Sequence, residues 1–110
     1  MSMLKEELRE IIKKRIVLDP EYDYGIEQCC LIEIEILTRD IHDTIAFLEE
    51  ECTGQEFVWI SEVFDEVVEK TQSREFIDCL YRVAEKFPGE CEKYNILYFI
   101  DTSKDFLKTQ

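Results

Sequence analysis

The residues best suited to chemistry in this sequence are carboxylates, and they are concentrated in residues 40–69. This segment holds ten acidic side chains and not one Lys or Arg, so it supplies −10 of the total charge of −13. Carboxylates without neighbouring cations attract metal ions or the basic side chains of a partner. The alternative is a solvated face that only keeps the chain soluble, but such charges could be spread over the whole surface. The acidic residues are Asp40, Asp43, Glu49, Glu50, Glu51, Glu56, Glu62, Asp65, Glu66 and Glu69.

The stretch Glu56 to Lys70 separates its charges from its apolar residues at helical spacing. Apolar side chains from Phe57 to Val68 fall on one side of a helix, and the carboxylates share an arc on the other. Trp59, the only tryptophan, lies at the border, where it either packs inward or anchors a partner. We predict a continuous amphipathic helix whose acidic face binds a cationic partner. Its predicted contact residues are Glu56, Trp59, Glu62, Asp65, Glu66 and Glu69.

A second acidic and aromatic patch precedes this segment. Leu18 to Gly25 contains Asp19-Pro20 and a glycine, which predicts a loop. Tyr22 and Asp23 within it could form the rim of a binding surface, and they complete the predicted partner-binding residues. The alternative is that the tyrosines only pack the loop onto the core.

Catalytic and metal-binding chemistry is predicted to be absent. His42 is the only histidine and has no suitable neighbour for a general base or a zinc site. Three glycines are too few for a glycine-rich phosphate loop. The carboxylates Glu62 to Glu69 could contact a divalent cation, but a continuous helix cannot wrap them around one ion. We therefore expect no enzyme, no metal ion and no cofactor.

Five cysteines are an odd number and include no CxxC pair. We interpret all of them as small apolar residues of a protein in a reducing compartment. An N-terminus without an apolar core and the lack of any apolar run near ~20 residues predict neither export nor a membrane span. We therefore expect a cytoplasmic protein. The cysteines are Cys29, Cys30, Cys52, Cys79 and Cys91.

The remaining elements are predicted to be helices. Apolar residues recur at helical spacing over residues 3–16 and from Ile41 to a run of glutamates at 49–51. Ile26 to Leu37 is ambiguous, because its isoleucines and glutamates alternate as in a strand, but no other segment could pair with a lone strand. We expect a buried helix there, with a break at Thr38 to Asp40.

The second half carries clear helix boundaries. Thr53 and Glu56 fit a capping box, Ser73 fits an N-cap, and Pro88-Gly89 ends the helix that follows Ser73. The last element spans about Cys91 to Leu107, with a break near Thr102-Ser103. We predict an all-α fold for residues 1–110, a single domain of five to six amphipathic helices packed as consecutive antiparallel hairpins.

Composition limits the partners. An apolar share of 45% with 12% aromatic residues indicates a folded chain. An acidic surface is repelled by nucleic acid and by anionic lipid, so we expect no direct contact with nucleic acid or membranes. Cationic proteins are the expected partners.

Parts of the sequence resemble small bacterial immunity proteins of contact-dependent growth inhibition and related polymorphic toxin systems. The resemblance lies in EFVWISEVFDEVVEKTQSREFIDCLYRVAEKFPGE (Glu56 to Glu90), in YNI (Tyr94 to Ile96) and in EYDYGIEQC (Glu21 to Cys29). It implies an all-helical cytoplasmic protein that binds the C-terminal toxin domain of a cell-surface effector. Such toxins are commonly nucleases, with EndoU-type RNases as one candidate class.

Charge and resemblance predict the same mechanism. A nuclease is cationic where it holds nucleic acid, and an acidic helix face could occupy that groove in place of phosphates. We expect a monomer that forms a 1:1 complex with a cognate basic toxin domain. The main alternative is a general helical adaptor that binds through an apolar groove, whose affinity would depend little on salt. The toxin's reaction, its target, and active-site or exosite inhibition stay open.

Overall fold

The computed structural model describes residues 3–108, and these residues form helices without any strand. The predicted all-α class is confirmed, as is the helical interpretation of residues 26–37. The expected count of five to six was too low, because the described chain has eight α-helices and two 3₁₀ turns. These are α1 (Leu4–Ile16), α2 (Asp23–Arg39), α3 (Ile41–Glu50), α4 (Gly54–Ile60), η1 (Ser61–Val63), α5 (Phe64–Thr71), α6 (Arg74–Lys86), α7 (Pro88–Tyr94), α8 (Ile96–Ser103) and η2 (Lys104–Phe106).

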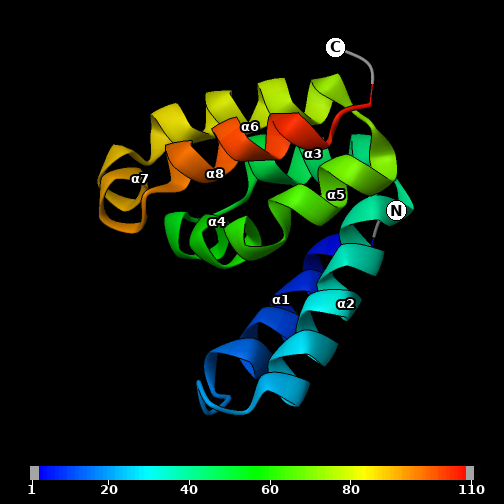
Figure 1. The fold of residues 1–110 in the computed structure, drawn as a ribbon, viewed down its shortest axis with the longest axis vertical. Helices are drawn as coiled ribbons and strands as arrows, with labels where there is room; N and C mark the ends of the chain where they lie inside the picture. Colours follow the sequence, from blue (N-terminus) through cyan, green and yellow to red (C-terminus); the bar gives the residue numbers. More distant parts are fainter. Residues whose placement is uncertain (1–2, 109–110) are drawn as a thin grey trace.

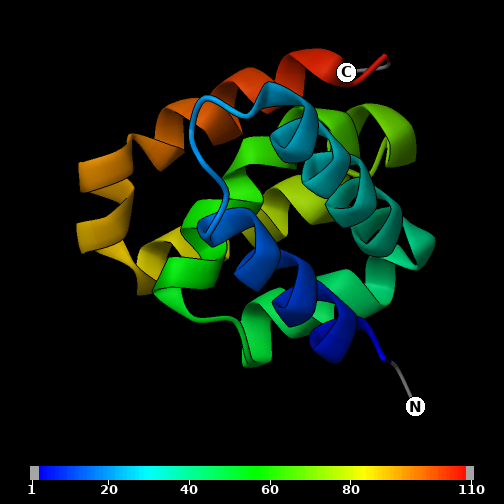
Figure 2. The same cartoon turned by 90° about the horizontal axis from the view of Figure 1, so that it is seen from below.

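Helices α1 and α2 form an antiparallel hairpin that extends from the other helices (Figure 1). The hairpin crosses α4 and α5, as the view from below shows (Figure 2). Its packing partners are α3, α4, η1 and α5. The acidic segment of the sequence is therefore covered on one side by α1, which is rich in Lys and Arg.

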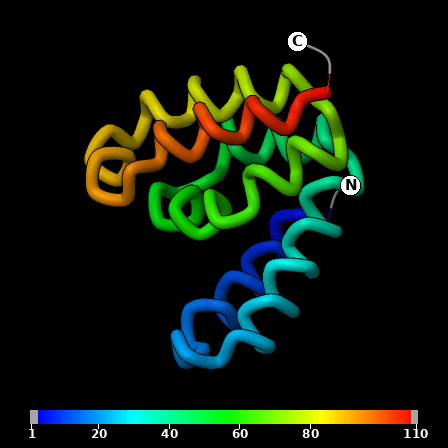
Figure 3. The backbone as a smooth tube through the Cα atoms, viewed as in Figure 1, coloured from blue at the N-terminus to red at the C-terminus, as the bar shows by residue number. Residues whose placement is uncertain are grey.

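The remaining helices do not all pack as consecutive hairpins. Helix α6 packs chiefly against α3 and α8, and α8 also packs against α5. Figure 3 shows α6 and α8 running side by side, joined at one end by α7. The predicted hairpin between the helices on either side of Thr71 to Ser73 is therefore wrong as the main contact, because α6 buries its apolar face against helices more distant in sequence.

Three phenylalanines connect the helices at the centre of the core. Phe57, Phe64 and Phe76 come from α4, α5 and α6, and each is at most 1% exposed. The ring centroids of Phe57 and Phe64 lie 5.5 Å apart, and those of Phe64 and Phe76 lie 6.4 Å apart in an edge-to-face arrangement. This cluster fixes the position of α4 and α5, which carry the predicted site. None of the helices in residues 3–108 combines the length and apolar character needed to cross a bilayer.

Helix boundaries follow local sequence signals. The capping box is confirmed, with the Thr53 hydroxyl accepting from the Glu56 backbone N–H and the Glu56 carboxylate accepting from the Thr53 N–H. Asp40 and Ser73 cap α3 and α6 in the same way. Pro88 does more than end α6, because it also occupies the first turn of α7, where a missing N–H costs nothing. In the last segment the chain breaks at Asn95, with φ of 57°, rather than only near residue 102.

Candidate functional site

The predicted continuous helix over residues 56–70 is interrupted. Helix α4 ends at Ile60, η1 follows, and α5 begins at Phe64, with Val63 at φ −119° and ψ 13° outside the α-helical region. The interruption lets the neighbouring residues Val63 and Phe64 both become buried, to 1% exposure each. Tertiary packing therefore divides the predicted site between three elements.

The protein's own cations neutralise several of the carboxylates in residues 40–69. Helix α1 supplies three of these cations, with N–O distances of 3.0 Å for Lys5–Glu51, 2.6 Å for Arg9–Glu56 and 2.6 Å for Arg15–Glu62. Arg82 on α6 pairs with Glu49. The charge count along the sequence missed these pairs, because the cations lie outside the acidic segment and reach it only in the fold.

Glu56 is a structural residue in this arrangement. Its carboxylate closes the capping box and accepts hydrogen bonds from Arg9. Partial burial raises its pKa, but the Arg9 and Thr53 donors outweigh that effect and hold the pKa below its usual value. The expectation that Glu56 faces a partner is corrected, since its charge is used within the chain.

Three of the predicted contact residues remain without a cation. Asp65, Glu66 and Glu69 on α5 have no ion-pair partner among residues 3–108, and Asp105 on η2 lies near enough to Asp65 to affect its ionisation. Partial burial, together with the charge of Asp105, raises the pKa of Asp65. We call these four residues the acidic face. The prediction that Asp65, Glu66 and Glu69 gather on one helix face is consistent with their helical spacing on α5.

An aromatic cavity adjoins the acidic face. Trp59 and Glu62 line a cavity of about 260 Å³ together with Tyr94 and Phe99. Tyr94 and Phe99 were not predicted as site residues. Their signal in the sequence is the unbroken apolar run from Ile96 to Ile100, of which only the two ends are buried.

Arg15 shows what this cavity wall can hold. Its guanidinium donates to both carboxylate oxygens of Glu62, at 3.1 and 2.6 Å, and lies over the Trp59 ring at 5.0 Å from the centroid. An aromatic face beside a carboxylate is a suitable environment for a guanidinium. Glu62, predicted to be free, is thus engaged with an internal arginine.

Tyr22 and Asp23 are not brought to this surface. They lie where α2 begins, at the end of the hairpin that points away from the other helices (Figure 1). Tyr22 contacts Tyr24, with ring centroids 6.4 Å apart, and its ring lies against Gly25, where an added Cβ would come within 2.6 Å. Gly25 is therefore needed for the close approach of this ring.

One buried carboxylate was missed altogether. Glu33 on α2 is 0% exposed, and neither of its carboxylate oxygens has a hydrogen-bond partner. Burial, reinforced by the charge of Glu62, raises its pKa to about 8, although Arg15 opposes the shift. The sequence held the signal, because Glu33 is spaced four residues from buried Cys29 and four from buried Leu37.

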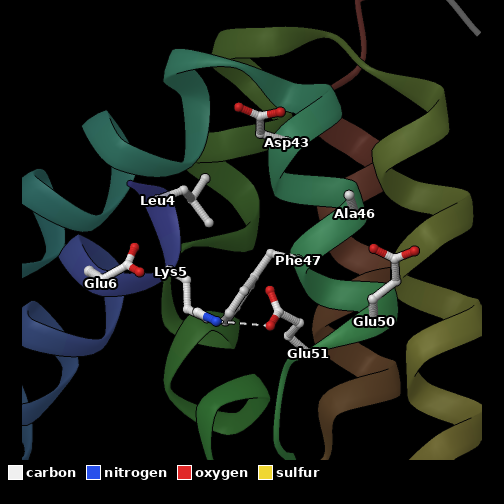
Figure 4. Close-up of a pocket in the computed structure, with 8 residues that line it drawn as sticks. All are labelled: Leu4, Lys5, Glu6, Asp43, Ala46, Phe47, Glu50 and Glu51. Carbon is white, nitrogen blue, oxygen red and sulfur yellow. Dashed lines mark hydrogen bonds and ion pairs between the residues drawn. The ribbon is translucent and has the colours of Figure 1, made fainter. Parts of the chain in front are cut away.

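A separate hollow of about 320 Å³ lies between α1 and α3 (Figure 4). The Lys5–Glu51 ion pair crosses it next to Phe47. The carboxylates of Glu6, Asp43 and Glu50 point in different directions around it, so the hollow does not bring an acid and base pair to one point.

Comparison with known proteins found no matching family model, no similar curated protein and no similar solved structure. The functional argument therefore depends on the surface of the chain itself.

Proposed function

We propose that this protein is an immunity protein of a contact-dependent or polymorphic toxin system, which binds and neutralises a cognate basic toxin domain, a nuclease such as an EndoU-type RNase, in the cytoplasm. One observation carries the proposal. The acidic face consists of four carboxylates without an internal cation, and it lies beside an exposed aromatic cavity.

The acidic face matches the chemistry of a nuclease groove. Such a groove holds cationic side chains for phosphates, and carboxylates on a helix can occupy the same positions. Glu66 lies on the α2 side of α5, since its charge acts on Cys30, and Asp65 lies on the η2 side, next to Asp105. Negative charge therefore extends across the outer surface of α5, where opposite potentials would accelerate association.

The aromatic cavity supplies the apolar part of the same interface. Leu97, Tyr98 and Phe99 on α8 are between 41% and 56% exposed, which is unusual for three successive apolar residues. Protein interfaces combine such aromatic anchors with a polar rim. The partner would place an aliphatic or aromatic side chain in the cavity and its cations on α5, forming a 1:1 complex.

Neutralisation of a toxin in cells tests the proposal. The toxin probe is the C-terminal domain of the large effector encoded beside the gene for this protein, expressed under a controlled promoter. Co-expression of the wild-type protein should restore growth, and the double variant Glu66→Lys with Glu69→Lys should not. Glu62 is left intact, because its replacement would expose Arg15 and confuse binding with stability.

The control variant is Asp78→Lys with Glu85→Lys. It makes the same change in net charge on exposed positions of α6, so it should still protect the cell. Growth without protection by the wild type, or equal protection by both double variants, would remove the acidic face as the binding site.

The exposed residues of α8 also favour a second function, that of an adaptor that binds an apolar partner. In that case Phe99→Ala would abolish binding while Glu66→Lys with Glu69→Lys would leave it unchanged. An interface that uses both surfaces requires both variants to weaken binding.

A further inference from the structure

Three side chains that can bind metal ions converge where α2 meets η1. Cys30 and Glu33 lie three residues apart on α2, on neighbouring positions of one helix face, and Glu62 approaches them from η1. The Cys30 sulfur and one carboxylate oxygen from each glutamate all lie within 4.8 Å of one another. These residues belong to different structural elements, so the fold and not the local sequence brings them together.

Glu33 provides an independent indication that something binds there. The residue is 0% exposed, and both of its carboxylate oxygens lack a hydrogen-bond partner while one of them is directed at this cluster. Buried carboxylates nearly always accept hydrogen bonds, because an unpaired one loses its solvation without compensation. A cation at the centre of the cluster would satisfy Glu33.

We propose that Cys30, Glu33 and Glu62 form a binding site for a divalent metal ion that accepts thiolate, with Zn²⁺ as the preferred ion. Zinc binds one sulfur at roughly 2.3 Å and carboxylate oxygens at roughly 2.1 Å, which places neighbouring ligand atoms roughly 3.5 Å apart. The three ligand atoms would have to draw together by about one ångström or less. Magnesium and calcium prefer oxygen ligands alone, so the sulfur selects against them.

The charges of the site permit this exchange. Burial raises the pKa of the Cys30 thiol to about 11, and Glu33 is also protonated in part at neutral pH. A Zn²⁺ ion that replaces these two protons leaves the total charge of the site unchanged. Arg15 can stay in place, because each carboxylate oxygen of Glu62 has a second lone pair for the metal.

Metal binding would fasten the hairpin to the remaining helices. Cys30 and Glu33 belong to the hairpin, whereas Glu62 also lines the aromatic cavity. The ion would therefore fix the angle between α2 and η1 and the wall of the cavity next to Trp59. This inference does not depend on the identity of the partner.

Titration of tag-free, reduced protein tests the site. The protein is first dialysed against EDTA and then against metal-free buffer, and ZnCl₂ is added in a calorimeter. We expect one ion per chain, and a tenfold or greater loss of affinity in Cys30→Ser and in Glu33→Gln. Cys52→Ser is the matched control, since Cys52 is another partly buried cysteine outside the cluster, and it should bind as the wild type does.

A spectroscopic measurement separates direct ligation from an effect on folding. Addition of CoCl₂ should produce a sulfur-to-cobalt charge-transfer band in the near ultraviolet, which Cys30→Ser abolishes and Cys52→Ser retains. Zinc should also raise the unfolding temperature of the wild type more than that of Glu33→Gln. Absence of one-to-one binding, a band that persists in Cys30→Ser, or equal affinity in all three variants would overturn the proposal.

Discussion

At the scale of single residues, Arg15 is the cation that most affects the candidate site. It donates to both oxygens of Glu62, stacks on Trp59, and its side chain is only 14% exposed. The basic run at residues 13–15 suggests a helix end in the sequence, but one of its members is an internal partner for the acidic segment. The carboxylates that bind a partner are those that such cations leave free.

Replacement of Arg15 tests this assignment. Arg15→Ala should lower the free energy of unfolding by about 2 kcal/mol, because it removes a largely buried bidentate ion pair and leaves Glu62 beside Glu33 without a cation. Urea denaturation measures the change. Arg82→Ala removes an ion pair to Glu49 at the surface and should have a much smaller effect. Equal losses in the two variants would contradict the assignment.

Glu33 predicts a pH dependence of stability. Its pKa in the folded protein is raised to about 8, while in the unfolded chain it has the ordinary value near 4.5. The folded state therefore holds a proton that the unfolded state releases, so stability should fall as pH rises from about 5 to about 8, by at most about 1.4 kcal/mol per pH unit.

Thermal unfolding in the presence of EDTA measures this dependence. Glu33→Gln cannot ionise and should lack the decline attributed to Glu33, so the two proteins should differ most near pH 8. The comparison isolates Glu33 from the other titrating groups, which both proteins share. Parallel stability curves for wild type and Glu33→Gln would show that Glu33 does not hold its proton.

At the scale of elements, short signals in the sequence determine where helices begin, and tertiary contacts determine where they bend. Thr53, Ser73 and Pro88 could be assigned from local chemistry, and each does cap or start a helix. The interruption at η1 could not, because the 100° periodicity of residues 56–70 is equally compatible with a straight helix. Packing of Val63 and Phe64 against the core decides between the two.

The capping box predicts a specific energetic effect. Thr53→Ala should lower the free energy of unfolding by about 1 kcal/mol, because the backbone N–H of Glu56 loses its acceptor at the start of α4. Gln55→Ala, an exposed change in the same turn, should lie within about 0.5 kcal/mol of the wild type. Chemical denaturation of both variants under the same conditions provides the comparison. A loss in Gln55→Ala as large as in Thr53→Ala would contradict a role for the cap.

At the scale of the whole molecule, the hairpin of α1 and α2 divides the acidic residues into two groups. Lys5, Arg9 and Arg15 on α1 neutralise the carboxylates closest to the hairpin. The sequence could predict an all-α protein and a strongly acidic segment, but not this division, because it depends on which helices meet. For the same reason it could not place Tyr94 and Phe99 beside Trp59, nor Glu33 beside Glu62.

Association kinetics at two salt concentrations tests the central claim, that the acidic face captures a cationic partner. The binding partner is an inactive form of the toxin domain encoded beside the gene. For the wild type and for Asp78→Lys with Glu85→Lys, the association rate constant should fall about tenfold or more from low to high salt. For Glu66→Lys with Glu69→Lys it should be slow at low salt and change little. Salt-independent association of the wild type, or equal rates for the two double variants, would contradict the claim.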